Sequence, residues 1–319
     1  MGIGATTMSS ALPPTVALLG TTASGKSALA LRLARTLDDV ELVSVDSMQV
    51  YRGMDIGTAK ATPAEQAEIR HHLIDVVDPW EQYSVARYQA DARAVLADID
   101  SRGQRALLVG GTGLYLRAVI DDLDIPGQHP EVRAELETES DTRSLHRRLH
   151  QLDPVAAARM EPDNRRRIIR ALEVTIGSGR AFSSYGPGLD APAPDAIAQV
   201  GIRLRPPVVA TRIEQRYGQQ LADGFLDEVE ALAHLDPAPS RTATQALGYR
   251  ELFAHLRGET TIDEAVELAV RRTRAFARRQ RAWFRRDPRV TWVDADADPM
   301  EAAEAVTDLV AEAFAVANT

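Results

Sequence analysis

Short apolar segments and longer amphipathic segments alternate through the first 120 residues of the chain. Apolar runs occur at 16–19, 41–46, 72–77 and 105–109, and the stretch 84–101 has the spacing of an amphipathic helix. Apolar runs of about four to eight residues suit buried strands, whereas a repeat near 3.6 residues suits a helix packed on a sheet. The pattern predicts an α/β fold in which helices flank a mostly parallel sheet.

The pattern changes near Asp121. From there to 198, polar helical segments are interrupted by prolines and no strand pattern is present; an alternating strand returns at 199–204. We therefore predict three parts, which are a flexible leader at 1–14, a core domain formed by 15–120 and 199–319, and a helical insertion domain at 121–198.

The C-terminal third is mostly helical. Thr261 and Glu264 have the spacing of a capping box, which would open a long helix that Asp287 and Pro288 should end. An apolar run at 290–293 predicts a last strand after that helix.

The composition excludes several classes of protein. The chain has 319 residues, of which 45% are hydrophobic and 26% charged, and it has no cysteine. Disulfides, thiolate zinc sites and cysteine nucleophiles are therefore excluded. The N-terminus has no basic region followed by a continuous apolar run, so we expect no secretion signal. No apolar stretch approaches the roughly 20 residues of a membrane span. We expect a cytoplasmic, monomeric protein that makes no contact with membranes.

The charge is distributed unevenly. The formal net charge is −9, yet the stretch 271–289 contains nine arginines and a single acid, Asp287. A second cluster consists of Arg165, Arg166 and Arg167 together with Arg170. Two arginine patches on an acidic protein indicate a docking site of limited size for a polyanion. Aromatic residues interleave with the first patch, which favours RNA over a merely solvated face.

Residues 20–27 read Gly-Thr-Thr-Ala-Ser-Gly-Lys-Ser and match the phosphate-loop pattern at every fixed position. The motif lies between an apolar run and a helical segment, as the chemistry requires. Glycines let the backbone surround an anion, and the loop N–H groups and the helix N-terminus attract it. We expect a di- or triphosphate to bind to Gly20, Thr21, Thr22, Ala23, Ser24, Gly25, Lys26 and Ser27, with the Ser27 hydroxyl helping to hold Mg²⁺.

Two further residues follow predicted strands. Asp46 opens a polar segment, 46–60, and Thr112 follows the strand at 105–109. The carboxyl ends of parallel strands form the ligand-binding edge of such sheets, so both residues are candidates for the phosphate cleft. Plainer interpretations remain, namely a helix-capping aspartate and a glycine-rich turn. The strand before Thr112 lacks the terminal aspartate of most ATPases. His71 and His72 with Glu68 have metal-ligand spacing, but a solvated or capping histidine pair explains them better.

Together the motifs resemble the tRNA dimethylallyltransferase family, whose members prenylate adenosine 37 beside the anticodon. The resemblance extends over nearly the whole chain, through 20–27, 46–60, 108–115, 153–159, 170–174, 245–250, Thr273-Arg274 and 278–280. It implies a P-loop core related to nucleotide kinases and a helical insertion that contacts the anticodon stem. The segment 121–198 occupies the position of that insertion.

The resemblance also implies roles for single residues. Thr22 to Ser27 would bind the pyrophosphate of dimethylallyl diphosphate, Asp46 would act as general base, and Thr112 and Lys26 would assist the leaving group. The base is extruded from its stack to reach such a site. The implied tRNA contacts are Asp46, Ser47, Met48, Gln49, Thr112, Arg133, Arg166, Arg167, Ile168, Ile169, Arg170, Gln245, Tyr249 and Arg250.

The residues leave three alternatives open. An ATP-dependent small-molecule kinase explains the phosphate loop but gives no role to the insertion or to the arginine patches. A prenyltransferase for free adenylate would not need the insertion. An RNA-binding switch controlled by a nucleotide would not need Asp46.

Overall fold

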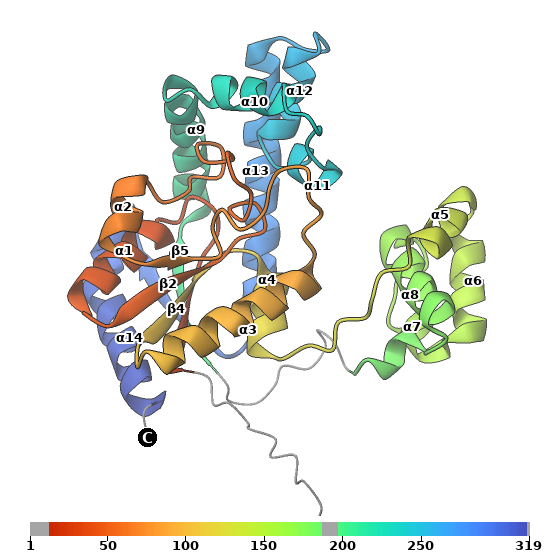
Figure 1. Ribbon diagram of the computed structural model, residues 1–319, viewed down its shortest axis with the longest axis horizontal. Helices are drawn as coiled ribbons and strands as arrows, with labels where there is room; N and C mark the ends of the chain where they lie inside the picture. Colours follow the sequence, from red (N-terminus) through yellow and green to blue (C-terminus); the bar gives the residue numbers. More distant parts are fainter. Residues whose placement is uncertain (1–12, 187–196, 318–319) are drawn as a thin grey trace, which may run out of the picture. The chain divides into compact units, whose positions relative to one another are not determined.

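The computed structural model describes residues 13–186 and 197–317, so the leader expected at 1–14 lies almost wholly outside the described residues. The chain forms two compact units. One combines the chain up to Ile120 with the chain from Asp195 onward, and the other is Asp121–Pro194 (Figure 1).

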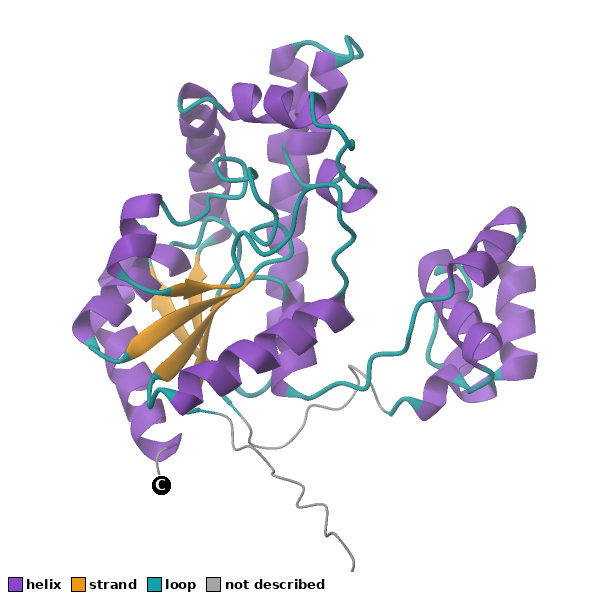
Figure 2. Ribbon diagram, in the orientation of Figure 1, coloured by secondary structure: helices purple, strands orange, loops and turns teal. Residues whose placement is uncertain are grey.

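The first unit is built on a sheet in which every neighbouring pair of strands runs parallel (Figure 2). The order is β3-β2-β4-β1-β5-β6. This arrangement confirms the predicted fold class. The strands are β1 (Thr15–Leu19), β2 (Val40–Val45), β3 (His71–His72), β4 (Arg105–Gly110), β5 (Ala198–Leu204) and β6 (Val290–Ala295).

The third strand is much shorter than the run at 72–77 predicted. Leu73 and Asp75 have φ angles of 60° and 55°, which a strand cannot contain. The chain beyond β3 lies beside the segment after β2, where the N–H of Val76 donates to the carbonyl of Val50 at 2.9 Å. This segment therefore builds a loop wall at the edge of the sheet.

Helices cover both faces of the sheet. Helices α1 (Lys26–Thr36) and α14 (Ala303–Ala317) pack on one face, and α3 (Val85–Ser101) and α4 (Gly113–Ile120) pack on the other (Figure 1). Strand β1 has no exposed side chain because both of its faces are covered. Helix α3 begins where the sequence predicts, with the Ser84 hydroxyl accepting from the N–H of Arg87.

The remaining helices of this unit are α2 (Pro63–Glu68), α9 (Pro206–Ala222), α10 (Phe225–Ala233), α11 (Arg241–Thr244), α12 (Tyr249–Leu256) and α13 (Ile262–Phe284), with a 3₁₀ turn η2 (Pro299–Ala302). The predicted capping box of α13 is confirmed. Thr261 accepts from the N–H of Glu264, and the Glu264 carboxylate accepts from the N–H of Thr261 at 2.9 Å. The helix ends just before Asp287 and Pro288.

The second unit contains helices and no strand in its described part, up to residue 186. Its elements are α5 (Pro130–Thr138), α6 (Thr142–Leu152), α7 (Pro154–Ala158), α8 (Arg165–Ser178) and η1 (Phe182–Ser184). Leu136, Leu145, Leu149, Ile168 and Leu172 form much of its own apolar core. In the described ranges of both units, no helix has the length and apolar character to cross a bilayer.

Candidate functional site

The phosphate loop joins β1 to α1 in the first unit. Gly25 has a φ angle of 81° and Ala23 one of 60°, so the backbone turns sharply within the loop. A Cβ at Gly25 would lie 2.2 Å from the Pro299 ring, which leaves no room for a larger residue. The helix that follows begins at Lys26 and directs its N-terminus at the loop.

Two side chains far away in the sequence hold this loop. The Gln280 amide oxygen accepts from the N–H of Thr22 at 2.8 Å, and its NH₂ group donates to the carbonyl of Gly111 at 2.9 Å. Arg212 donates from Nε to the carbonyl of Ala23 at 2.9 Å. Helix α13 thereby attaches the loop to the turn that precedes Thr112, and α9 holds the loop at Ala23.

Lys26 is half-buried, and the surrounding protein changes the pKa of its ammonium group. Desolvation by the surrounding protein lowers the pKa of Lys26 to about 8, the Asp46 carboxylate partly opposes that shift, and the Arg216 guanidinium adds to it. The pKa of Arg216 is also lowered, chiefly by burial. Two cations that face one acid in a partly desolvated wall form a pocket for an additional anion.

Asp46 and Thr112 lie side by side because β2 and β4 are neighbours. Val45 pairs with Gly110 in the sheet, and each candidate residue follows closely after its strand. The N–H of Ser47 donates to the Thr112 hydroxyl at 3.3 Å. One Asp46 oxygen, Oδ1, accepts from the N–H groups of Met48 and Gln49 at 2.8 and 3.4 Å. No bond to Oδ2 is present in the described part of the chain, and that oxygen is the one available to a ligand.

These groups open into one cavity of about 990 Å³, all of whose walls belong to the first unit. The structure thus brings together most of the predicted core residues. The predicted residues in its walls are Thr22, Ala23, Gly25, Lys26, Ser27, Asp46, Ser47, Met48, Gln49, Thr112, Gln245 and Tyr249. Gly20, Thr21, Ser24 and Arg250 are not among them.

Sequence reasoning missed several residues of this cavity. Arg212 and Arg216 are four residues apart on α9, so they share one helix face, and both line the cavity. That spacing was the available signal, but a pair of arginines on a helix has no special meaning without its neighbours. Lys60, Phe276, Arg279 and Gln280 also line the cavity and were not assigned to it.

Tyr249 and Arg250 have different surroundings. The Tyr249 ring is fully buried, and its hydroxyl donates to Glu228 at 2.5 Å. Burial, together with the Glu228 carboxylate, raises the pKa of Tyr249 far above its usual range. Arg250 is exposed on α12. The hydroxyl of Tyr249 is used in a hydrogen bond within the protein, whereas Arg250 is accessible to a large partner.

The predicted RNA contacts of the second unit divide into two groups. Glu173 is buried and accepts from Arg170 at 2.8 Å, from Arg133 at 3.3 Å and from the N–H of His129 at 2.9 Å. Arg170 also donates to the carbonyls of Pro126 and Gly127. Arg133 and Arg170 therefore both hold the buried Glu173, while the Arg133 side chain stays 41% exposed.

Arg166 and Arg167 are exposed, and within the described ranges neither makes an ion pair. Ile168 and Ile169 are 0% and 3% exposed and belong to the apolar core of this unit. The expectation that Ile168 and Ile169 contact RNA is corrected here for their side chains, because both pack inward while the two arginines before them point outward.

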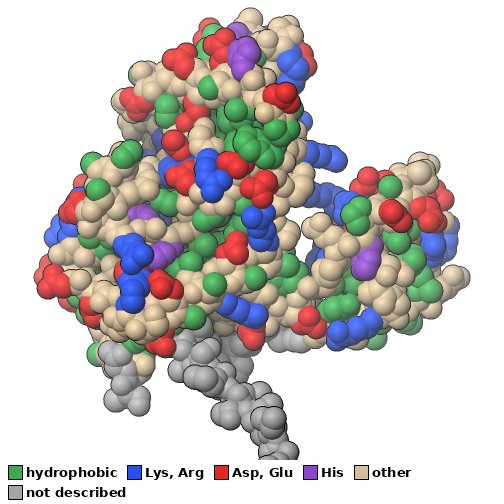
Figure 3. Space-filling model, viewed as in Figure 1, with side chains coloured by type: hydrophobic (Ala, Val, Ile, Leu, Met, Phe, Trp, Pro, Cys, Tyr) green, Lys and Arg blue, Asp and Glu red, His purple; other side chains and the backbone are tan. Residues whose placement is uncertain are grey.

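The arginine-rich stretch is partly neutralised by the fold. Arg272 pairs with the buried Glu251, Arg274 pairs with Glu214 at 2.5 Å, and Arg289 pairs with Asp287 at 2.7 Å. On the face drawn in Figure 3, basic and acidic side chains are interspersed. Arg278, Arg279, Arg285 and Arg286 stay exposed, so about half of the predicted patch remains accessible.

The histidine pair is structural. His72 bonds to Glu41 at 2.6 Å, His71 bonds to the carbonyl of Ile69 at 2.7 Å, and Glu68 pairs with Arg35. The described residues contain no group of three or more histidines and acids arranged to hold a metal.

The fold and the cavity define a class of protein, a P-loop protein whose phosphate cavity opens beside Asp46 at the carboxyl edge of a parallel sheet. Residues 49–287 match the IPP transferase family. A tRNA dimethylallyltransferase of Kineococcus radiotolerans is 47% identical over 312 residues, which cover 95% of this chain and 98% of that relative. One of Corynebacterium glutamicum is 46% identical over 287 residues, covering 89% and 95%.

Solved structures agree with this result. The full-length tRNA isopentenylpyrophosphate transferase of Bacillus halodurans aligns with a TM-score of 0.67 at 35% identity and covers 96% of this chain and 99% of that one. A eukaryotic dimethylallyltransferase acting on tRNA aligns with a TM-score of 0.76 at 23% identity, covering 93% and 80%, which shows a common fold alone. The chain belongs to the IPP transferase family.

Proposed function

We propose that the protein transfers a dimethylallyl group from dimethylallyl diphosphate to N6 of adenosine 37 in tRNA and releases pyrophosphate. The observation that carries the proposal is the single cavity shared by the phosphate loop and Asp46. The names of the relatives support dimethylallyl transfer and tRNA as the acceptor.

The leaving group is the first requirement of this reaction. As the allylic C1–O bond breaks, negative charge grows on the pyrophosphate, and the loop N–H groups, Lys26 and Arg216 lie where such charge would bind. The allylic carbon tolerates positive charge, so a loose transition state is accessible. The reaction also requires that water be kept from that carbon.

Asp46 serves the acceptor. The lone pair of the adenine N6 amine is delocalised into the ring, so the amine is a weak nucleophile until its proton is removed. Two backbone N–H groups hold Asp46 through Oδ1, which leaves Oδ2 to take the N6 proton as the new N–C bond forms. Thr112, beside it, would contact the departing oxygen.

The residues fit a Mg²⁺ ion of the kind that binds together with phosphates. Such an ion keeps several waters and needs only one or two protein oxygens, and Ser27 at the start of α1 provides a hydroxyl in the cavity wall. When bound, the ion would supply positive charge that neutralises the pyrophosphate.

The second unit, Asp121–Pro194, is the proposed RNA-binding insertion. Arg166 and Arg167 would contact backbone phosphates, whereas Arg133 and Arg170 shape the unit through Glu173. The proposed working form is a monomer in the cytoplasm.

The test is mass spectrometry of a nuclease digest of unmodified tRNA incubated with the protein and Mg²⁺. One reaction contains dimethylallyl diphosphate and a parallel one contains ATP. We expect a prenyl-sized mass gain on adenosine 37 only with the allylic donor. Formation of ADP without modified tRNA would overturn the proposal in favour of a kinase.

A further inference from the structure

Lys60 occupies an unusual position for this chain. Among 37 lysines and arginines there are only two lysines, Lys26 and Lys60, and both line the same cavity. The side chain of Lys60 is 2% exposed. Its ammonium donates to the carbonyl of Tyr51 at 2.9 Å, to Asp75 at 2.5 Å and to Asp55.

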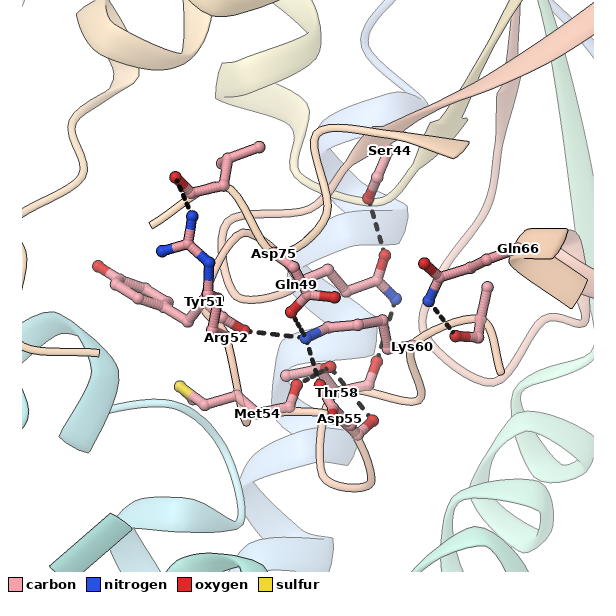
Figure 4. Close-up of polar contacts among 12 residues, drawn as sticks. Ser44, Gln49, Tyr51, Arg52, Met54, Asp55, Thr58, Lys60, Gln66 and Asp75 are labelled. Atoms are coloured by element: carbon pink, nitrogen blue, oxygen red, sulfur yellow. Dashed lines mark hydrogen bonds and ion pairs between the residues drawn. The ribbon is translucent and has the colours of Figure 1, made fainter. Parts of the chain in front are cut away.

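The geometry of this contact explains the residue type. An ammonium group has three donors, and Lys60 meets three acceptors, so its hydrogen-bonding capacity is filled (Figure 4). A planar guanidinium with five donors cannot satisfy the same compact set. Lys60 thereby connects the segment after β2 with the loop that contains Asp55 and with the segment that contains Asp75.

Glu228 holds the same loop through its backbone N–H groups. Its carboxylate accepts from the backbone N–H groups of Asp55, Ile56 and Gly57 at 2.8, 2.7 and 3.1 Å, and also from the Tyr249 hydroxyl. A Cβ at Gly57 would lie 2.2 Å from the Phe225 ring, so helix α10 lies directly against the loop. Segment 55–60 is therefore held both by Glu228 and by Lys60.

The fixed loop determines the orientation of Gln49. The carbonyls of Thr58 and Ala59 lie 3.2 and 3.3 Å from the Gln49 amide nitrogen, and the Ser44 hydroxyl lies 2.7 Å from its oxygen (Figure 4). Carbonyls only accept, so the NH₂ group must face them and both of its protons are used. The only capacity left to the amide is an acceptor lone pair on Oε1. The N–H of Asp75 also binds the backbone carbonyl of Gln49 at 3.1 Å.

We propose that Lys60 and Glu228 are positioning residues, which act on the acceptor nucleoside through Gln49. They hold the loop whose carbonyls orient the Gln49 amide, two residues beyond Ser47 and three beyond Asp46. Neither residue touches the phosphate loop, which is held by Gln280 and Arg212 instead. The inference rests on the proposed function, because it concerns the acceptor side of the same cavity.

The test is a double-mutant cycle with Lys60→Met, Gln49→Ala and the combined variant. Steady-state transfer to an anticodon stem-loop RNA is measured, together with the dissociation constant of pyrophosphate. Lys60→Met should lower kcat for RNA on the order of tenfold to a hundredfold, as expected for a misplaced contact. The affinity for pyrophosphate should change by less than about twofold, because Lys60 and the phosphate loop share no hydrogen-bond partner.

The cycle separates positioning from general stability. If Lys60 acts through Gln49, the combined variant loses no more activity than Gln49→Ala alone. Losses that multiply, or a fall in pyrophosphate affinity equal to the fall in kcat, would overturn the proposal.

Glu228→Gln provides a second variant, with Glu230→Gln, exposed on the same helix, as its matched control. An amide in place of the carboxylate presents donors to N–H groups, so backbone amide exchange across 53–60 should accelerate in Glu228→Gln and stay unchanged in Glu230→Gln. Equal exchange rates in both variants would refute the claim that Glu228 holds this loop. This measurement needs no turnover; failure of the wild-type protein to modify RNA would instead contradict the proposed function.

Discussion

At the scale of single residues, most polar groups of the site are already used in hydrogen bonds within the protein. Asp46 uses one oxygen to hold its own loop, Gln49 uses nearly its whole amide, and Lys60 uses all its donors. The groups still able to bind a ligand are therefore few and oriented in advance. Oriented groups need no reorganisation as charge develops, which is the physical basis of their effect on rate.

Replacing Asp46 by asparagine tests the proposed base. The amide keeps the shape and can still accept from the N–H groups of Met48 and Gln49, but it cannot take a proton. We expect kcat to fall by roughly a hundredfold to ten-thousandfold while RNA affinity changes little. Rapid-quench kinetics and filter binding measure the two quantities. Near-normal turnover would exclude Asp46 as the base.

Lys26 predicts a pH dependence of diphosphate binding. Its lowered pKa of about 8 means that the ammonium loses its proton as the pH rises through 8. A bound diphosphate favours the charged form, so binding should take up a proton near this pH and weaken above it. Since the chain has only two lysines, ¹³C-labelled lysine gives two side-chain signals, and Lys26→Arg assigns them. A Lys26 signal that titrates near the ordinary value of about 10.4 would contradict this prediction.

At the scale of elements, helices far apart in sequence hold the loops that line the cavity. The start of α4 touches α13, where a Cβ at Gly113 would lie 2.1 Å from the Trp283 indole nitrogen. The contact leaves space only for glycine beside Thr112. A change in this contact would move Thr112 away from Asp46.

We therefore expect Gly113→Ala to destabilise the protein by about 1–3 kcal/mol through overpacking and to lower kcat. Gly218→Ala is the matched control, because nothing lies within 4 Å of a Cβ at that position inside α9. Alanine in an open helix position stabilises by up to about 1 kcal/mol. Urea denaturation compares the two variants. Equal midpoints would show that crowding against Trp283 does not lower the free energy of unfolding.

At the scale of the whole molecule, a unit built on a parallel sheet is joined to a helical unit that has its own core. The net charge of −9 gives no general attraction to nucleic acid, so RNA binding has to come from exposed local groups. In the second unit Arg166 and Arg167 are such groups.

Replacing both Arg166 and Arg167 by alanine should weaken tRNA binding and lower the slope of log K against log salt by about 2, since each phosphate contact contributes about one. The thermal midpoint should not change, because both side chains are exposed. Glu173→Gln, in contrast, should lower the stability of this unit by removing a buried acceptor. An unchanged salt slope in the arginine variant would assign both arginines to solvent.

The sequence alone determined the fold class, the phosphate loop, the capping box at Thr261 and the strand-end position of Asp46. These features depend on local patterns, such as apolar runs, glycine spacing and capping residues, whose physics acts over a few residues. The prediction was wrong for the third strand, because the positive φ angles at Leu73 and Asp75 come from long-range pairing with the segment after β2.

Only the tertiary structure decided which distant side chains complete the cavity. Gln280 binds a loop 258 residues away, Arg212 one 189 residues away and Glu228 one more than 170 residues away. The tertiary structure also decided which arginines form ion pairs with buried acids, as at Glu173 and Glu251, and which stay exposed. Such assignments depend on the crossing of helices and strands in space, and no local spacing along the chain encodes that crossing.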